Sequence, residues 1–167
     1  MARLTLILGG ARSGKSSRAI ALCPPPRVFV ATAEALDAEM AERIARHRAD
    51  REGDWRVTEA PLDLAGALAG AAAPGTAVLV DCLTLWLSNL IHAERDPEAG
   101  TEALLAAIPG LPGEIVMVSN EVGMGIAPAT ALGRAFRDVQ GRANQRVAAA
   151  ADRVEFVIAG LPMVLKG

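Results

Sequence analysis

Eight residues near the start of the chain have the types and spacing of a phosphate-binding loop. Residues 9–16 read GGARSGKS, which matches the pattern G-x-x-x-x-G-K-[ST], and an apolar run at 4–8 directly precedes them. In such loops, backbone N–H groups and the N-terminal end of the following helix bind phosphate oxygens. The sequence therefore predicts that the chain binds a nucleoside triphosphate, with contacts from Gly9, Gly10, Ala11, Arg12, Ser13, Gly14, Lys15 and Ser16.

A carboxylate that suits a magnesium ion follows a second apolar run. Residues 77–80 are apolar and are followed by Asp81. In phosphate-loop proteins, an acid at the end of a buried strand lies beside the Mg²⁺ that the loop hydroxyl ligates. We therefore expect Ser16 and Asp81 to hold Mg²⁺, although an aspartate can also end a strand with no such role.

A third apolar run, at 115–119, is followed by a loop with two glycines. Residues 120–126 read NEVGMGI, and glycines allow the backbone to approach a ligand closely. A plain turn with a solvated glutamate explains the same residues. The spacing alone does not decide between the two interpretations.

His47 lies in a segment with helical spacing and is the candidate nucleophile. It shares one face of the predicted helix with three apolar residues, Leu36, Met40 and Ile44, and it has arginines four residues away on both sides. Neighbouring cations favour the neutral imidazole, which is the nucleophilic form. The alternative is a core histidine on a helix whose charged residues form ordinary surface pairs.

Apolar runs alternate with helical patterns along the chain, as expected for a parallel sheet connected by crossover helices. The predicted strands, apolar enough for burial on both faces, are 4–8, 28–32, 77–80, 115–119 and 154–159, with 161–166 as a further edge strand. The predicted helices are 15–22, 33–51, 62–72, 83–93, 102–108 and 129–152. We expect an α/β fold of the P-loop NTPase type, with helices on both faces of a mostly parallel β-sheet. Ligands bind beyond the carboxyl ends of such strands, where the polar residues lie.

Composition limits the class of protein. A length of 167 residues suits one domain spanning 1–167, and the net charge of −2 argues against a protein that mainly binds nucleic acid. No apolar run reaches the ~18 residues of a membrane span, and no signal segment is recognisable, so we expect a cytoplasmic protein. Cys23 and Cys82 lack metal-ligand or redox spacing and are expected to be buried or incidental thiols.

These segments together resemble the bifunctional adenosylcobinamide kinases and adenosylcobinamide-phosphate guanylyltransferases of cobalamin biosynthesis. The similarity covers essentially the whole chain, and the run at 120–126 is far more specific than a general nucleotide motif. The matching pieces are 9–16, 31–32, 37–40, 43–44 with His47, Trp55 with Glu59, 81–82, 120–126, 136–138, 141–142 and 144–146.

The resemblance implies two reactions. In the first, the γ-phosphoryl group of ATP or GTP passes to the hydroxyl of the aminopropanol arm of adenosylcobinamide. In the second, His47 attacks the α-phosphorus of GTP, releases pyrophosphate and holds GMP as a phosphoramidate, which the substrate phosphate takes to give adenosylcobinamide-GDP. His47 and Lys15 are then the catalytic residues, with Lys15 and Mg²⁺ stabilising charge on the phosphates.

The resemblance also implies guanine-nucleotide contacts and a homotrimer. The matching residues are Thr32, Ala33, Glu34, Ala49, Asp50, Arg51, Glu52 and Glu59, of which Glu59 could accept the guanine N–H groups. Glu52 stands where family members commonly have proline, which leaves the local loop shape open. Arg46 stands where some have a second histidine, so His47 is the only candidate nucleophile on its helix.

Two other functions stay open at this stage. A single-function P-loop small-molecule kinase needs the loop, Asp81 and Mg²⁺, but it has no use for an inward-facing His47 among arginines. A non-enzymatic GTP-binding switch would use the same loop and leave no covalent adduct.

Overall fold

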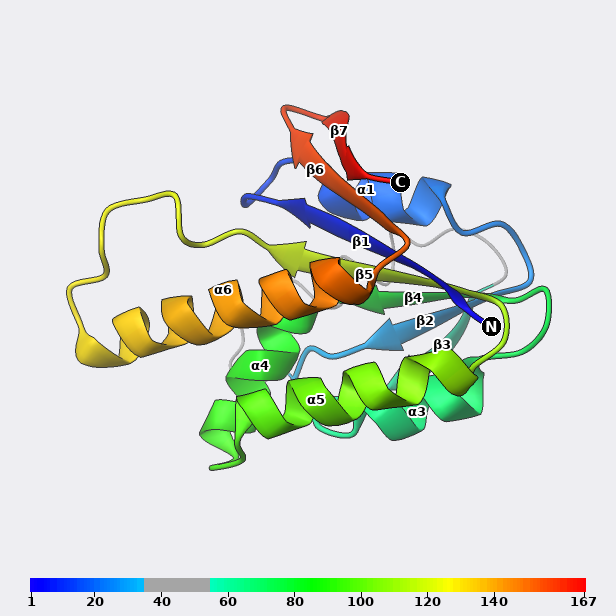
Figure 1. Ribbon diagram of the computed structural model, residues 1–167, viewed down its shortest axis with the longest axis horizontal. Helices are drawn as coiled ribbons and strands as arrows, with labels where there is room; N and C mark the ends of the chain where they lie inside the picture. The colour runs from blue at the N-terminus through cyan, green and yellow to red at the C-terminus, as the bar shows by residue number, and fades with distance from the viewer. Residues whose placement is uncertain (35–54) are drawn as a thin grey trace.

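The computed structural model describes residues 1–34 and 55–167, which form one seven-stranded sheet in the order β3-β2-β4-β5-β1-β6-β7 (Figure 1). All pairs among β1 to β6 are parallel, and β7 pairs antiparallel with β6. This confirms the mostly parallel α/β sheet, including the expected edge strand at 161–166. The strands are β1 (Arg3–Gly9), β2 (Arg27–Ala31), β3 (Trp55–Glu59), β4 (Ala77–Asp81), β5 (Glu114–Asn120), β6 (Arg153–Ile158) and β7 (Leu161–Lys166).

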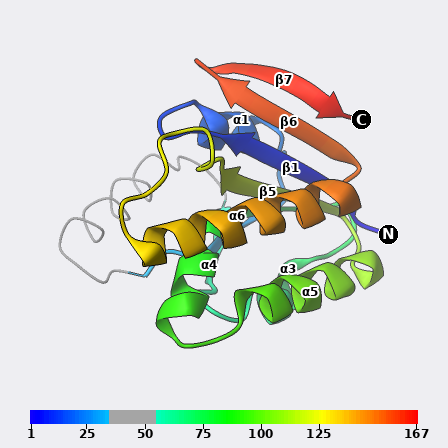
Figure 2. The same cartoon turned by 60° about the vertical axis from the view of Figure 1, so that its left-hand side comes forward.

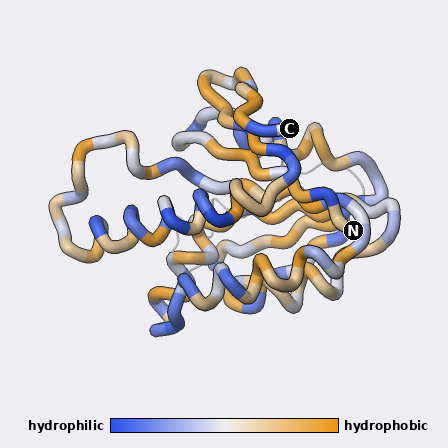
Figure 3. The backbone as a smooth tube through the Cα atoms, in the orientation of Figure 1, coloured by the Kyte–Doolittle hydropathy of each residue, from blue (hydrophilic) through white to orange (hydrophobic). Residues whose placement is uncertain are grey.

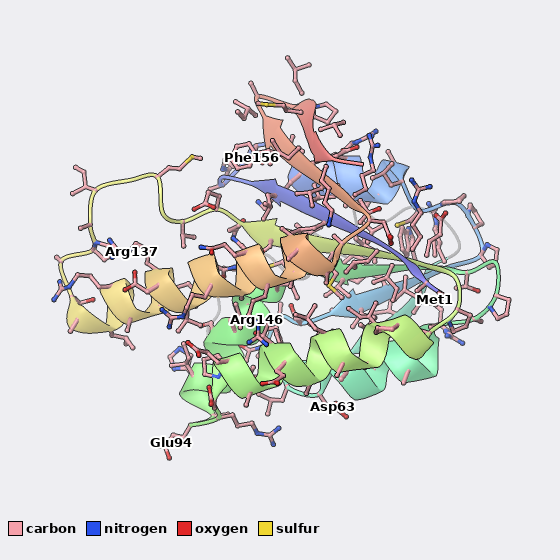
Figure 4. All side chains as sticks on the ribbon, in the orientation of Figure 1. Met1, Asp63, Glu94, Arg137, Arg146 and Phe156 are labelled. Atoms are coloured by element: carbon pink, nitrogen blue, oxygen red, sulfur yellow. The ribbon has the colours of Figure 1, made fainter. Side chains whose placement is uncertain are left out.

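Helices cover both faces of the sheet, as predicted (Figures 1 and 2). Four helices and the short 3-10 helix η1 contribute to a large apolar core on one face, and α1 packs into a smaller core on the other. Figure 4 shows Arg146 between α6 and α5, where its guanidinium donates to the Glu98 carbonyl at 3.4 Å. The helices are α1 (Lys15–Ala21), α3 (Leu64–Ala71), α4 (Leu83–His92), α5 (Pro97–Ala107) and α6 (Ala131–Ala150), with η1 at Ile108–Gly110.

Alternating side chains of the central strands fill these two cores. In β1, Leu4, Leu6 and Leu8 contribute to the larger core, whereas Ile7 contributes to the core beneath α1. Because both faces of the central strands are buried, these strands are mostly hydrophobic in colour in Figure 3. Full burial of one such side chain stabilises the fold by about 1.5–3 kcal/mol. The buried sheet therefore holds in place the strand ends from which the loops at its carboxyl edge begin.

Strand β3 was not among the predicted strands. It pairs only with β2, in a register that joins Arg27 to Trp55 and Ala31 to Glu59. An edge strand is not buried on both faces, so it lacks the continuous apolar run that identified the central strands. The Trp55 ring packs edge-on against Phe29 at 5.9 Å, and the Arg27 guanidinium lies 4.4 Å from the ring centroid.

Capping residues set helix boundaries that the apolar pattern alone placed elsewhere. Helix α5 begins at Pro97, earlier than the predicted start at 102, because Asp96 accepts a hydrogen bond from the Glu98 N–H at 2.9 Å. Asp63 and Thr130 cap α3 and α6 in the same way. Of the predicted helix 33–51, only residues 33 and 34 are described, and they are not helical.

Both cysteines are free and buried, as predicted. Desolvation raises the pKa of the Cys23 thiol to about 12, with a smaller contribution from the charge of Glu114. The thiol is therefore protonated and unreactive at neutral pH. Within residues 1–34 and 55–167, no helix has the length and apolar character required to cross a membrane.

Candidate nucleotide-binding site

The carboxyl ends of the parallel strands bring the predicted phosphate loop and the predicted metal ligand to one edge of the sheet. Strand β5 lies between β1 and β4, with Gly9 paired to Asn120 and Asp81 paired to Val118. The phosphate loop after Gly9 and the Asp81 carboxylate therefore lie on either side of the end of β5. This is the arrangement that the sequence pattern predicted for a triphosphate and its metal.

The phosphate loop turns sharply between β1 and α1. Arg12 and Gly14 have positive φ angles of 55° and 94°, and Ser13 N–H donates to the Gly10 carbonyl at 3.3 Å. The Lys15 ammonium donates to the same carbonyl at 3.1 Å, so the lysine folds back over the loop. Gly160 N–H donates to the Ser13 carbonyl at 2.8 Å, which ties the loop to the turn between β6 and β7.

Close packing at the base of the loop requires glycine at position 9. A Cβ atom there would lie 2.5 Å from Ser13 Oγ and 2.8 Å from the Val157 carbonyl oxygen. The Ser13 hydroxyl is buried and has no hydrogen-bond partner among the described residues. Unpaired buried polar atoms are uncommon in native proteins, and binding sites are one place where they occur.

Asp81 and Lys15 both act electrostatically on the thiol of Cys82, the residue that precedes α4. Burial and then the negative charge of Asp81 raise its pKa to about 11, whereas the positive charge of Lys15 opposes that shift. Both charges are therefore close to the thiol, which stays protonated at neutral pH. Cys82 is accordingly a packing residue at this edge and not a nucleophile.

Thr32 follows β2 and fixes the backbone beside Asp81. Its side chain is fully buried, and its hydroxyl donates to the Cys82 carbonyl and accepts from the Cys82 N–H, both at 2.8 Å. The Asn89 carboxamide donates to the Thr32 carbonyl at 2.7 Å. Because both hydrogen bonds of the Thr32 hydroxyl are made to Cys82, this side chain positions the backbone next to Asp81.

The remaining predicted contacts lie along the same edge or beyond the described residues. Ala33 and Glu34 follow Thr32 and are half-buried, and Glu59 is exposed at the end of β3, paired with Ala31. The candidates outside the described residues are His47, Ala49, Asp50, Arg51 and Glu52.

The sequence carries the signature of one protein family over nearly its whole length. The family "Cobinamide kinase / cobinamide phosphate guanyltransferase" matches residues 5–165. The chain belongs to this family. The bifunctional adenosylcobalamin biosynthesis protein CobP of Pseudomonas aeruginosa is 49% identical to it over 168 residues, which covers 97% of this chain and 96% of that protein. CobU of Salmonella typhimurium is 42% identical over 180 residues, covering 98% and 99%.

The fold is also shared with a more distant protein. The flagellar accessory protein FlaH of Methanocaldococcus jannaschii superposes with a TM-score of 0.50 at 11% identity, covering 98% of this chain and 78% of that protein. This likeness concerns the fold alone. The resemblance inferred from the sequence, both to the kinase and guanyltransferase family and to the P-loop NTPase fold, is confirmed.

Polar residues of α6 to which the sequence analysis gave no role in the site hold the backbone at the end of β5. Asn144 donates from Nδ2 to the Asn120 carbonyl at 3.0 Å, and its Oδ1 accepts from Ser119 Oγ at 2.7 Å. Gln140 Nε2 donates to Ser119 Oγ at 2.9 Å and to Asn144 Oδ1 at 3.0 Å. The sequence does contain a pattern that could have indicated these residues. Gln140 and Asn144 are amides four residues apart, on the same helical face as the apolar Ala143 and Val147.

Gly9→Ala is expected to weaken GTP binding without unfolding the sheet. The added methyl group must displace Ser13 or the Val157 backbone, and such overpacking costs about 1–3 kcal/mol. If that cost falls on the loop, the Kd for GTP rises roughly tenfold to a hundredfold, which calorimetric titration would measure. Gly70→Ala on α3, where a Cβ meets no atom within 4 Å, is the matched control. An unchanged Kd for the Gly9 variant would contradict this account of the loop.

Proposed function

We propose that this chain, as a single domain over residues 1–167, phosphorylates adenosylcobinamide with ATP or GTP and then transfers GMP from GTP to adenosylcobinamide-phosphate. The product is adenosylcobinamide-GDP. Membership of the cobinamide kinase and guanyltransferase family over residues 5–165 is the observation that carries this proposal. The phosphate loop beside Asp81 supports it, because both reactions require a bound triphosphate.

In the kinase reaction, the substrate hydroxyl oxygen bonds to the γ-phosphorus while the bond from that phosphorus to the bridging oxygen breaks. The nucleoside diphosphate leaves and the hydroxyl proton is released. Loop N–H groups between Gly10 and Ser16, together with the Lys15 ammonium, stabilise the charge that moves onto the leaving phosphate. This role requires Lys15 to exchange the Gly10 carbonyl, which it contacts at 3.1 Å, for phosphate oxygens.

In the guanylyl reaction, an imidazole nitrogen of His47 bonds to the α-phosphorus of GTP and pyrophosphate leaves. A phosphate oxygen of adenosylcobinamide-phosphate then bonds to the same phosphorus, and the bond to His47 breaks. Covalent catalysis divides one difficult transfer into two easier ones. Glu59 suits the recognition of guanine, because a carboxylate accepts hydrogen bonds from the N1–H and N2–H groups that adenine lacks.

The residues at this edge fit a magnesium ion. Ser16 lies in the first turn of α1, directly after Lys15, and the charges of Asp81 and Lys15 both act on the Cys82 thiol. Hydroxyl and carboxylate oxygens are ligands that Mg²⁺ accepts, with the triphosphate supplying further ligands. When bound, the ion would neutralise charge on the phosphates.

The family resemblance supports a homotrimer and a cytoplasmic location. Both are part of the proposal. Family membership over residues 5–165 also argues against a single-function kinase and against a GTP-binding switch.

The proposal is tested by incubating the protein with adenosylcobinamide, ATP, GTP and Mg²⁺ and identifying the corrinoid products by mass. We expect adenosylcobinamide-phosphate first and adenosylcobinamide-GDP after it. GTP binding without either product would contradict the proposed function and favour a switch. Formation of the phosphate alone would favour the single-function kinase.

A further inference from the structure

Asn120 ends β5 between the phosphate loop and Asp81, and its backbone is held at several points. Its N–H donates to Thr84 Oγ1 at 2.9 Å, and its carbonyl accepts from Asn144 Nδ2 at 3.0 Å. The next N–H, of Glu121, donates to the Gly9 carbonyl at 3.1 Å. The Cα atom of Asn120 is therefore fixed relative to the start of the phosphate loop.

The amide that holds Asn120 is itself part of a buried network. Ser119 and Gln140 are fully buried and Asn144 is 5% exposed, and the three side chains hydrogen bond to one another at 2.7–3.0 Å. Buried polar networks restrict the arrangement of their members, and in this one every side-chain N or O atom except Gln140 Oε1 is hydrogen-bonded. This network links α6 to the end of β5 and so holds the backbone from which the Asn120 side chain extends.

The carboxamide oxygen of Asn120 differs from the side-chain oxygens of Ser119 and Asn144, which are hydrogen-bonded. Its Oδ1 atom is buried and has no hydrogen-bond partner within residues 1–34 and 55–167, although the backbone atoms of the same residue are paired. Gln140 Oε1 also lacks a partner in the described part of the chain, but it lies on α6 and not at the end of a strand. An unpaired acceptor at the nucleotide edge of the sheet points to a donor that arrives with the substrates.

The chemistry of the reactants limits what that donor can be near the phosphates. Phosphate oxygens of a bound triphosphate are acceptors and cannot pair with a carboxamide oxygen. The acceptor substrate of the kinase reaction brings a hydroxyl group, which is a donor and must lie beside the γ-phosphorus. An asparagine has two rotatable side-chain bonds, so its carboxamide can turn to aim Oδ1 toward a group bound at this edge.

We propose that Asn120 Oδ1 accepts a hydrogen bond from the substrate hydroxyl that attacks the γ-phosphorus. The bond directs the hydroxyl lone pair at the phosphorus, while the new oxygen–phosphorus bond forms, the bond to the diphosphate breaks and the proton passes to solvent. This inference rests on the proposed kinase reaction. It assigns Asn120 to that reaction and not to the guanylyl reaction, in which the attacking groups are an imidazole and a phosphate.

The test compares both half-reactions in Asn120→Ala and Asn120→Leu. Each variant removes the acceptor, and leucine is close to asparagine in shape. We expect kcat for phosphorylation of adenosylcobinamide to fall roughly tenfold or more, as for the loss of one hydrogen bond to a reacting group. The KM for ATP and the rate of GMP attachment from GTP are expected to stay unchanged. The melting temperature of Asn120→Leu is expected to equal or exceed that of the unmodified protein, because leucine leaves no unpaired acceptor.

Other outcomes would overturn the inference. An equal loss in both half-reactions would assign Asn120 to the bound triphosphate or to a metal-bound water, and no loss in either would make it structural. A lower melting temperature in Asn120→Leu, together with loss of both activities, would likewise assign the residue to folding. Failure of the unmodified protein to phosphorylate adenosylcobinamide would instead contradict the proposed function, and this inference with it.

Discussion

His47→Ala is expected to abolish the GMP-sized mass increase that the unmodified protein acquires on incubation with GTP and Mg²⁺. The imidazole nitrogen is the nucleophile that bonds to the α-phosphorus. Attack by water would release GMP and would leave no covalent intermediate on the protein. Loss of a nucleophile lowers turnover by a factor of roughly 10⁴ or more. Intact-mass measurement after short incubations reads this directly, and the adduct of the unmodified protein should be acid-labile, as a phosphoramidate is.

The second histidine provides the matched control. His92 ends α4 on an exposed surface, so His92→Ala should keep the full GMP adduct. Phosphorylation of adenosylcobinamide should continue in His47→Ala, since the kinase reaction does not use this residue. A His47→Ala protein that still acquires an acid-labile GMP adduct would contradict the assignment.

Arg18→Met is expected to lower the free energy of unfolding by roughly 3 kcal/mol, as for breaking a buried ion pair. Glu155 on β6 is fully buried, and Arg18 on α1 donates to its carboxylate from two nitrogens, at 2.7 and 2.9 Å. Arg153 also donates to it at 2.9 Å, which keeps the loss at the low end for such pairs. Urea denaturation at neutral pH would measure the change. Because α1 follows the phosphate loop, weaker nucleotide binding should accompany it.

The same contact determines how stability depends on pH. The hydrogen bond from Arg18 is the largest cause that holds the pKa of Glu155 below its ordinary value, against desolvation, which raises it. A lowered folded-state pKa stabilises the protein above the unfolded pKa, and that contribution is lost as pH falls through the folded pKa. The difference between Arg18→Met and the unmodified protein should therefore be full at neutral pH and shrink below the ordinary glutamate pKa of about 4.3.

An exposed ion pair on the other face of the sheet separates this effect from a general loss of charge. Arg142 on α6 contacts Glu98 on α5 at 2.7 Å, with both side chains about half exposed. Arg142→Met should change the free energy of unfolding by less than about 1 kcal/mol, because surface pairs are screened by water. Equal losses for Arg18→Met and Arg142→Met would contradict the importance assigned to the buried carboxylate.

The sequence determined the features that depend on neighbouring residues. The phosphate loop between β1 and α1 and the apolar run ending at Asp81 are local patterns, and both appear where they were predicted. The central strands were recognisable because burial on both faces requires continuous apolar residues. The family was also readable, because its most specific run, at 120–126, is contiguous in the chain. Strand β3 escaped prediction because an edge strand needs no such run.

Only the tertiary structure placed distant segments together. The insertion of β5 between β1 and β4 pairs Gly9 with Asn120 and brings the end of β5 between the loop and Asp81. Arg18 and Glu155 come from elements far apart in the chain, and Asn144 and Ser119 lie 25 residues apart. Strand order and hydrogen-bond partners depend on how the whole chain packs, so no local spacing encodes them. That is why the loop could be identified from its sequence, whereas the unpaired Asn120 acceptor beside it could be seen only in the folded chain.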